Sequence, residues 1–433
     1  MGEGSVAVLD TGLPGSKDVR PDWMAQYRAV RRQTEALCEP LVAEDYVVQS
    51  MPDVSPTKWH LAHTSWFFET FLLAPHAAGY QAFDPHFAYL FNSYYVTVGD
   101  RHCRQNRGLL SRPTVAQVYA YRKHVDEAME RFLSGLSATE ARELQPVIEI
   151  GLNHEQQHQE LMLTDIKHVF WVNPLRPAYR PSLAKKAGAV PPMRWVGFEE
   201  GIRWIGHDGS GFAFDNETPR HRVFADSFQI GSRLVTNGEY KQFIEDGGYS
   251  RADLWLSMGF AAAQQEQWEA PLYWIEQDGR WLNHTLSGLR PVDDEEPVCH
   301  VSYFEADAYA RWAGARLPSE FEWEIASESV SIGGNFVESG QYHPVPLRED
   351  GDGPRQMFGD VWEWTRSAYL GYPGYQPPTG ALGEYNGKFM CNQFALRGGS
   401  CATPRDHIRR TYRNFFPPES RWQFMGFRLA RDA

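Results

Sequence analysis

Cysteine is scarce in this chain, with five residues among 433, and no two of them form a CxxC pair. This scarcity excludes a disulfide framework or a zinc ribbon and is typical of a reducing compartment. The chain also lacks any run of about 18 apolar residues that would cross a membrane. Its first residues lack the basic and apolar segments of a signal peptide. We therefore expect a cytoplasmic protein that spans no membrane.

Basic residues are outnumbered, since 42 Lys and Arg stand against 55 Asp and Glu and leave a net charge of −13. A protein with this balance lacks the positive surface that general nucleic-acid binding needs. Aromatic residues are abundant instead, with 15 Trp and 20 Tyr. This composition is typical of aromatic-lined pockets or of loops pinned by large side chains.

The N-terminal part, residues 21–172, has the periodicity of a helical bundle after a tail at residues 1–20. Four amphipathic segments are predicted to be helices, at residues 22–41, 55–73, 115–133 and 137–172. Ser55 is expected to cap the second helix, and Pro146 to kink or restart the fourth. Four such helices predict a four-helix bundle, which builds metal sites from side chains on facing helices. The long connection at residues 74–112 indicates a functional loop.

The second half of the chain has a different character. Residues 173–195 are rich in proline and are predicted to link two domains. From residue 196 to residue 433, glycine, tryptophan and short β-type runs dominate, with turns such as Asp278-Gly279. Two helices are expected there, and they cover residues 237–246 and 303–313. We predict an irregular α+β domain.

The strongest chemical indication is the pair His154 and His158 inside the fourth predicted helix. Residues i and i+4 lie on one face of an α-helix, one turn apart, so two imidazoles in this spacing can share a metal ion. Gln157 is expected to point toward the same space. These residues are therefore candidates for two metal ligands and a functional neighbour.

Residues 154–158 also match H-E-x-x-H, the zinc metalloprotease signature. The extended form of that motif needs Gly and His where this chain has Leu161 and Thr164, so the protease hypothesis lacks a third ligand. An upstream ligand is easier to supply, because His60 and His63 both lie on the second predicted helix. A three-histidine site with open positions suits Fe(II), Zn(II) or another divalent ion.

Three further groups of residues are candidates for function. Tyr94 and Tyr95 lie in the long loop, where a hydroxyl near a metal can donate a proton. Arg101 and Arg104 in the same loop can hold a carboxylate. The last group combines an amide with two aromatic rings and suits a cationic ligand. Its members are Asn414, Phe415 and Phe416.

Motifs in both halves resemble known families. The N-terminal part resembles the DinB-like domain of the ergothioneine sulfoxide synthases, at WHLAHTSWFFE (59–69) and HEQQH (154–158). The C-terminal part resembles the formylglycine-generating-enzyme/sulfatase-type domain, a C-type-lectin relative. Its matching motifs are RLPSEFEWE (316–324), GDVWEW (359–364), RGGS (397–400) and GFRL (426–429). The resemblance implies a DinB-like four-helix bundle followed by a C-type-lectin-like domain.

The same resemblance implies an O2-dependent, non-heme iron sulfoxide synthase of ergothioneine biosynthesis. Such an enzyme joins the sulfur of cysteine or γ-glutamylcysteine to imidazole C2 of hercynine, the Nα-trimethylated histidine, and forms the sulfoxide. The implied Fe(2+) ligands are His63, His154 and His158, with His63 rather than His60 as the last residue of the family's Leu-Ala-His triplet. The implied substrate contacts are Gln157, Asn414, Phe415 and Phe416 for hercynine, and Arg101 and Arg104 for the thiol's carboxylate.

Two departures from the family pattern affect these expectations. Better-known members take their catalytic tyrosine from the C-terminal domain, where this chain offers two phenylalanines. We therefore expect the catalytic hydroxyl on Tyr94 or Tyr95. Formylglycine-generating activity uses a cysteine pair that Cys391 and Cys401 do not match, so the second domain is expected to be a substrate-binding lid.

Three alternatives for the function stay open. An ovothiol-type 5-histidylcysteine sulfoxide synthase joins sulfur to imidazole C5 of plain histidine, but it usually carries an added methyltransferase domain. The others are an H-E-x-x-H zinc hydrolase and a lectin-like binding protein with a structural metal. Among thiols we favour free cysteine, because no second basic patch stands out for a γ-glutamyl carboxylate.

Overall fold

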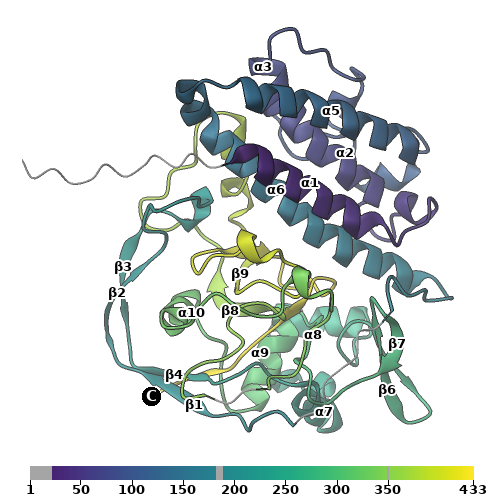
Figure 1. Cartoon of the computed structure of the whole chain (residues 1–433). Coiled ribbons are helices and arrows are strands. Elements are labelled where there is room, and N and C mark those ends of the chain that lie inside the picture. Colours follow the sequence, from purple (N-terminus) through teal and green to yellow (C-terminus); the bar gives the residue numbers. More distant parts are fainter. Residues whose placement is uncertain (1–21, 182–188, 349–350) are drawn as a thin grey trace, which may run out of the picture.

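The computed structural model describes residues 22–181, 189–348 and 351–433. The tail predicted at residues 1–20 lies outside the described residues. A helical bundle forms one end of the molecule and a mixed region of helices and short strands forms the other (Figure 1). The predicted fold class, a four-helix bundle followed by an α+β domain, is confirmed.

Four helices make up the bundle. They are α1 (Trp23–Cys38), α2 (Thr57–Phe68), α5 (Val115–Gly135) and α6 (Ala138–Val172). Helix α2 packs against α5 and α6, and α1 packs against α6. The side chains of Asp22, Thr114 and Ser137 cap α1, α5 and α6 by accepting from backbone N–H groups of the first turn. These caps satisfy donors that have no partner within the helix, which explains where three of the helices begin.

Two predicted helix boundaries in the bundle differ from the structure. Helix α6 runs through Pro146 as one continuous helix, so Pro146 does not restart it. Packing of the flanking turns holds the helix although proline removes one backbone hydrogen bond. Pro56 rather than Ser55 occupies the cap position of α2, and the Ser55 hydroxyl accepts from Arg107 Nη1 over 2.9 Å instead of capping the helix.

The connection at residues 74–112 contains more regular structure than expected. A π-helical turn at Glu69–Leu73 extends α2 into α3 (Ala74–His76). Helix α4 (Phe87–Leu90) and a 3-10 helix at Arg104–Leu109 follow. The tyrosines and arginines singled out above therefore lie on a partly helical loop that packs against the bundle.

The described residues of the C-terminal domain form four small sheets. One antiparallel sheet joins β1 (Trp195–Phe198), β4 (Phe228–Gly231) and β12 (Ala430–Asp432). Strand β2 (Gly201–Ile205) pairs with β3 (His221–Ala225), and β5 (Trp274–Gln277), β6 (Arg280–Thr285) and β7 (Gly288–Pro291) form a meander. The fourth sheet has the order β10 (Asn414–Phe416), β9 (Phe394–Arg397), β8 (Trp362–Ala368), β11 (Met425–Gly426), with β11 parallel to β8.

Helices of this domain pack beside the sheets. The two predicted ones appear as α7 (Asn237–Glu245) and α9 (Tyr303–Trp312), whereas α8 (Ser257–Gln265) and α10 (Glu320–Ser327) were not expected. The Asp278-Gly279 turn joins β5 to β6, and both residues have positive φ, 52° and 70°. This is the backbone that a two-residue hairpin turn requires, and it explains the Asp-Gly pair.

Helix α6 belongs to the bundle but also carries the main contact with the second domain. Its Glu160 carboxylate accepts hydrogen bonds from Trp362 Nε1 (2.8 Å), Ser400 Oγ (2.5 Å) and Thr403 Oγ1 (2.9 Å). Gly398 of the RGGS motif has a φ of 97°, and a Cβ there would lie 2.5 Å from a backbone carbonyl oxygen. Glycine at this position therefore lets the chain turn tightly and bring Ser400 to α6.

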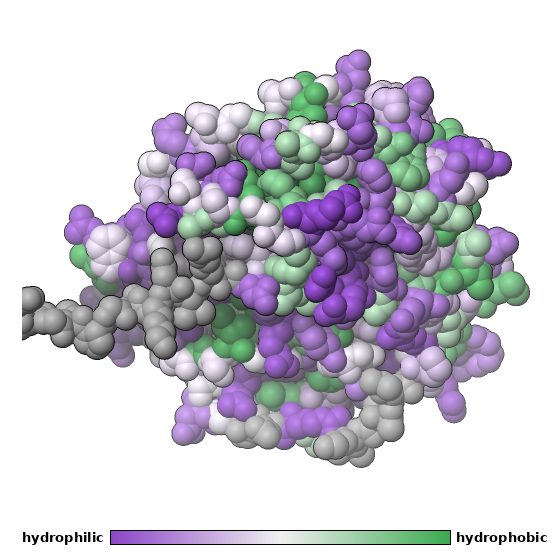
Figure 2. Space-filling view, turned by 45° about the horizontal axis from the view of Figure 1, so that its top comes forward, coloured by the Kyte–Doolittle hydropathy of each residue, from purple (hydrophilic) through white to green (hydrophobic). Residues whose placement is uncertain are grey.

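The surface is mixed, and the interior pairs its charges. On the face in Figure 2, polar residues surround small separate hydrophobic patches. Inside the second domain, buried arginines meet glutamates, which offsets the cost of removing charge from water. These pairs are Arg397–Glu324, Arg413–Glu320 and Arg428–Glu363.

Among the described helices, none is both long enough and apolar enough to span a bilayer.

Candidate active site

Helices α2 and α6 bring three histidines together inside the bundle. The nitrogens of His63, His154 and His158 lie within 4.8 Å of one another, and all three residues are buried. The Nε2 atoms of His63 and His154 are 3.1 Å apart. Two nitrogens bound at right angles to one ion, at ~2.1 Å each, lie about 3 Å apart. This donor set therefore fits a divalent transition metal.

Neighbouring groups orient two of these rings. His63 Nδ1 lies 2.6 Å from the backbone oxygen of Phe91, so its N–H donates there and Nε2 keeps a lone pair facing His154. Such a lone pair is repelled by another nitrogen lone pair unless a cation lies between them. The indoles of Trp59 and Trp66 stack on the His63 ring, with centroids 4.5 and 5.4 Å away. His63 is thus fixed in both tautomer and orientation.

His60, the other upstream candidate, supports the site from outside. Its Nδ1 lies 2.8 Å from His158 Nδ1, and its Nε2 lies 3.0 Å from Asp165 Oδ2. If the Asp165 carboxylate accepts from His60 Nε2–H, His60 Nδ1 accepts from His158 Nδ1–H. That arrangement frees His158 Nε2 for an ion, as carboxylate–histidine pairs do at metal sites. In the described chain, His154 Nδ1 has no hydrogen-bond partner.

The electrostatic environment keeps these histidines neutral. Burial lowers the pKa of His63 and of His158 well below the usual range, and the neighbouring His154 lowers both further. Burial likewise lowers the pKa of His154 to about 3. A neutral imidazole offers a lone pair, so at neutral pH a metal ion can bind these nitrogens without displacing protons.

A cavity of about 870 Å³ opens onto this centre from between the two domains. His154, His158 and Gln157 line it from α6. The Gln157 amide donates from Nε2 to Tyr412 Oη over 2.7 Å, and its Oε1 accepts from Tyr385 Oη. The prediction that Gln157 faces the histidine side of the helix is confirmed. Two tyrosines of the second domain hold its amide plane.

The two candidate tyrosines occupy different positions. Tyr94 lines the cavity, whereas Tyr95 is fully buried against Trp66 and Phe71. Their rings stack with centroids 4.6 Å apart. Burial raises the pKa of both hydroxyls, so both are protonated at neutral pH. Within the part of the chain that the structure covers, the Tyr95 hydroxyl has no partner.

Arg101 and Arg104 line the cavity, but the guanidinium group of each donates to a backbone carbonyl of the same domain. Arg101 Nη1 donates to the Ser93 carbonyl over 3.0 Å, and Arg104 donates to the Asp53 carbonyl. A third arginine, Arg107, was missed although it continues the three-residue spacing. This spacing in a single loop was the available indication of a cluster.

Arg107 is the most deeply buried arginine of this loop, at 3% exposure, and it also lines the cavity. It lies 3.3 Å over the Trp59 ring and donates to the hydroxyls of Ser55 (2.9 Å) and Ser93 (3.3 Å). Its Nε has no partner among the described residues. Burial and the nearby Arg104 lower its pKa, so an anion in the cavity would stabilise the charged guanidinium.

Strand β10 forms an aromatic wall of the same cavity. Asn414, Phe415 and Phe416 all line it. Phe415 stacks on Tyr369 with centroids 4.1 Å apart, and Asn414 Oδ1 accepts from the Phe415 N–H. The structure thus brings the sequence-predicted groups from both domains to one cavity.

Comparisons with known proteins agree with this arrangement. The DinB superfamily profile matches residues 26–162, and the sulfatase-modifying factor enzyme 1-like domain profile matches residues 189–349 and 337–433. A hercynine oxygenase from Mycobacterium tuberculosis is 31% identical, over 88% of this chain and 92% of that protein.

The chain belongs to the hercynine oxygenase family. The hercynine oxygenase of Mycolicibacterium smegmatis is 34% identical over 65% of this chain and 70% of its own length. Ergothioneine biosynthesis protein 1 of Schizosaccharomyces pombe is 30% identical over 51% of this chain but only 28% of its own length.

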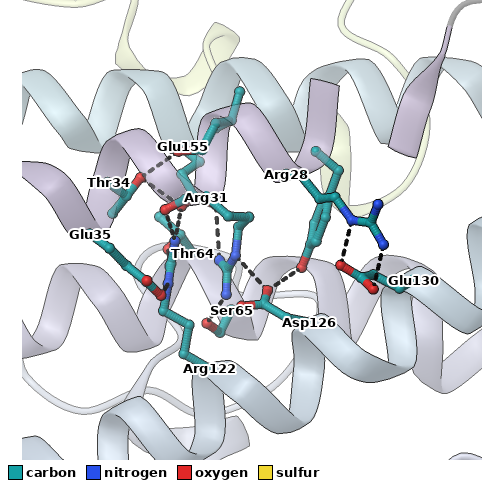
Figure 3. A network of polar contacts seen from close by, with 12 residues as sticks. Arg28, Arg31, Thr34, Glu35, Thr64, Ser65, Arg122, Asp126, Glu130 and Glu155 are labelled. Carbon is teal, nitrogen blue, oxygen red and sulfur yellow. Dashed lines mark hydrogen bonds and ion pairs between the residues drawn. The ribbon is translucent and has the colours of Figure 1, made fainter. Parts of the chain in front are cut away.

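The glutamate of the H-E-x-x-H motif, Glu155, is bound by side chains inside the bundle and not by groups of the cavity. Glu155 Oε1 accepts from Arg122 Nη2 (2.6 Å) and Thr34 Oγ1 (2.7 Å), and Oε2 accepts from Arg31 Nη1 (2.9 Å) (Figure 3). Although burial opposes ionisation, the two guanidinium groups hold the Glu155 pKa at about 2. Such a paired carboxylate cannot serve as the general base of a hydrolase, which argues against that alternative.

The sequence also did not indicate a segment of the second domain that closes the cavity. Tyr385, Asn386 and Phe389 all line it. The Tyr385 ring lies 5.9 Å from the His154 ring, and the Asn386 amide donates to Asp215 Oδ1 over 2.6 Å. This stretch has no repeated spacing or known motif, so only its position in the fold identifies it.

Proposed function

We propose that the protein is a metal-dependent sulfoxide synthase that joins the sulfur of a small thiol to imidazole C2 of hercynine. The observation that carries the proposal is the group of three neutral, buried histidines beside a cavity built by both domains. Membership of the hercynine oxygenase family supports the same substrate and favours it over the zinc hydrolase and lectin-like alternatives.

The reaction balances with one O2 for each product. A thiol S–H and the imidazole C2–H are lost, a C–S bond and an S–O bond form, and the second oxygen atom leaves as water. We assign His63, His154 and His158 as the residues that would hold Fe(2+). Bound iron would supply redox chemistry with O2 and open coordination positions.

Hercynine carries a trimethylammonium group, a carboxylate and an imidazole. The Gln157 amide, held by Tyr385 and Tyr412, is placed to hydrogen-bond the imidazole beside the histidines. The rings of Phe415 and Phe416 offer a cation–π surface to the trimethylammonium group. These contacts would hold C2 in a fixed position relative to the metal, which is where orientation contributes most to rate.

The thiol substrate requires a group that holds its carboxylate. Arg107 suits this role best, because it is buried, lines the cavity and keeps Nε without a partner among described residues. Arg101 and Arg104 would add positive potential at the same wall. A single cluster of arginines supports free cysteine, which has one carboxylate, over γ-glutamylcysteine, which has two.

We assign Tyr94 as the hydroxyl that donates a proton in the cavity, and Tyr95 as its packing partner. The position of Tyr94 on the cavity wall supports this division. Changing Tyr94 to Phe is expected to lower turnover by about 10²-fold, in the range of general acid catalysis. Changing Tyr95 to Phe removes a hydroxyl that does not line the cavity and should cost less than about threefold. Equal losses in the two variants would contradict the assignment.

The test of the function is anaerobic loading with Fe(II) or Zn(II), followed by O2 uptake and product mass. Hercynine or histidine is supplied with cysteine or γ-glutamylcysteine. We expect O2 uptake and a sulfoxide only with Fe(II), hercynine and cysteine. A product from plain histidine would support the ovothiol-type alternative. Activity with Zn(II), or no O2 uptake with any pair, would overturn the proposal.

A further inference from the structure

The loop that presents Tyr94 is held by residues of the other domain. This tyrosine loop, residues 92–97, follows α4 in the N-terminal domain. The segment 384–389 of the C-terminal domain lies against it. The side chains of Tyr385 and Phe389 line the cavity, while Glu384 and Lys388 contact the loop.

Glu384 binds the backbone of the tyrosine loop with both carboxylate oxygens. Its Oε2 accepts from the Val96 N–H over 3.1 Å, and its Oε1 accepts from the Thr97 N–H (2.9 Å) and hydroxyl (2.6 Å). Although burial opposes ionisation, the hydrogen bond from Lys388 and then these three donors lower the pKa of Glu384 to about 2. The carboxylate therefore stays ionised and acts as a fixed acceptor for two consecutive backbone amides.

Lys388, four residues later, completes the contact. Its Nζ donates to the Tyr94 carbonyl and to Glu384 Oε2, the latter over 2.8 Å. The same ammonium lies 4.9 Å from the centre of the Tyr94 ring and 5.8 Å from that of Phe389. Tyr94 is thus contacted at both its backbone and its ring by one cation.

The rest of the loop is held from within the first domain. The Asn92 side chain donates to the Tyr95 carbonyl (3.0 Å) and accepts from the Tyr95 N–H (3.2 Å). Asn92 thus holds the backbone of Tyr95, while the second domain holds backbone groups of Tyr94, Val96 and Thr97 on either side of it. An exposed i,i+4 ion pair alone contributes little, but here the pair also makes four hydrogen bonds to a loop beside the active site.

We propose that Glu384 and Lys388 are positioning residues that hold Tyr94 at the cavity wall. This inference rests on the proposed function, in which Tyr94 donates a proton. The second domain thus does more than cover the cavity: it sets the position of a tyrosine that belongs to the first domain. Loss of either side chain lets the loop move by a fraction of an ångström or more, which lowers kcat while the metal centre and the arginine cluster stay in place.

The test is a double-mutant cycle in the full-length, Fe(II)-loaded protein. Lys388→Met is expected to lower kcat by about 10- to 100-fold, with KM for the thiol within about twofold. In a Tyr94→Phe background the same change should have no further effect, because the group it positions is gone. Lys388→Arg keeps a cation and should restore most of the turnover. Lys123→Met is the matched control, since it breaks another i,i+4 pair, with Glu127, on the exposed side of α5.

Hydrogen exchange gives a readout that does not depend on turnover. In Glu384→Ala, the amides of Val96 and Thr97 should exchange at least about tenfold faster than in the parent, and those of α6 should not change. Unchanged exchange at both amides would overturn the inference, even if the parent enzyme makes no sulfoxide. Equal losses from Lys388→Met with and without the Tyr94 hydroxyl would overturn it too. Failure of the parent enzyme to consume O2 is instead a failure of the proposed function.

Discussion

Helix α6 carries two adjacent buried ionisable side chains, Glu155 and His154, which differ in whether charged partners offset the cost of burial. Glu155 is 0% exposed and keeps its charge, because Arg31 and Arg122 contact its two oxygens. His154, the preceding residue, is 2% exposed and stays neutral, because burial dominates and its pKa falls to about 3. Equal burial thus has opposite effects on charge, and the partners decide which one results.

The two side chains serve different purposes. Paired charges inside the bundle hold α1, α5 and α6 together at Glu155 (Figure 3). Neutral nitrogens of the adjacent His154 and His158 side chains keep lone pairs available for a metal. Lys167, three turns further along, is intermediate: its Nζ lies 2.6 Å from His300 Nε2, and burial lowers its pKa to about 8. Each group of side chains can be tested separately.

The largest effect is expected from the histidines. His154→Ala removes one of the three nitrogens proposed to hold the metal and should lower turnover by more than about 10³-fold, because a contribution of several kcal/mol from the metal would be lost. The iron content after anaerobic loading should fall, while the circular dichroism spectrum stays the same. His86→Ala, at an exposed histidine, is the control and should change neither quantity. Full iron occupancy in His154→Ala would show that the site is built differently.

Next in size is the effect of the buried glutamate. Glu155→Ala removes the fully buried carboxylate that Arg31 and Arg122 share and leaves them only Asp126 and Glu35, so it should lower the free energy of unfolding by about 3 kcal/mol. Denaturant titration measures this, with the exposed Glu127→Ala as the control. Turnover per folded molecule should stay within about threefold. A variant that kept its stability but lost its activity would instead assign Glu155 a chemical role.

A smaller effect, on metal affinity, is expected from Asp165, which contacts His158 through His60. Asp165→Asn removes the carboxylate that orients His60, and it should weaken metal affinity by about 10- to 100-fold. Competition with a chromophoric chelator measures this affinity directly. Asp84→Asn is a matched control, because Asp84 pairs with His86 in the same way on the surface. Equal affinities in the two variants would mean that His60 does not support the centre.

The smallest effect is a pH dependence at Lys167. Its pKa is lowered from 10.5 to about 8 on folding, so between these values the unfolded chain binds more protons than the folded one. Stability should therefore rise with pH over this window, by at most about 1.4 kcal/mol per pH unit. Lys167→Met should remove this rise in denaturant titrations at pH 8, 9 and 10. An unchanged slope would locate the proton release elsewhere.

Much of the bundle was predictable because its determinants are local. Caps such as Ser137 and the 3.6-residue periodicity depend on neighbours within one or two turns. A restart at Pro146 was expected from a local rule that disfavours proline inside a helix, whereas α6 continues through this residue. In the second domain, the Asp278-Gly279 turn was predictable, but α8 and α10 were not, because their short segments have little periodicity of their own.

The candidate site divides in a similar way. Tyr94, Arg104 and Asn414 were noticed individually from composition and resemblance, and the fold brings them to one cavity. Arg107 was missed, because burial rather than residue type sets it apart from the other arginines of the loop. Tyr385 had no motif, since its importance comes from a contact with Gln157 across 228 residues of sequence.

The sequence alone determined that His154 and His158 share a face of one helix, because α-helical geometry places i and i+4 one turn apart whatever surrounds them. Helix spacing alone did not separate His60 from His63; the family resemblance favoured His63, and the tertiary structure places His63 with the pair and His60 behind His158. It also decided that Glu155 points to two arginines rather than to the cavity. Those outcomes depend on which side chains α1, α2 and α5 bring into contact with α6, and such contacts are set by packing between distant segments.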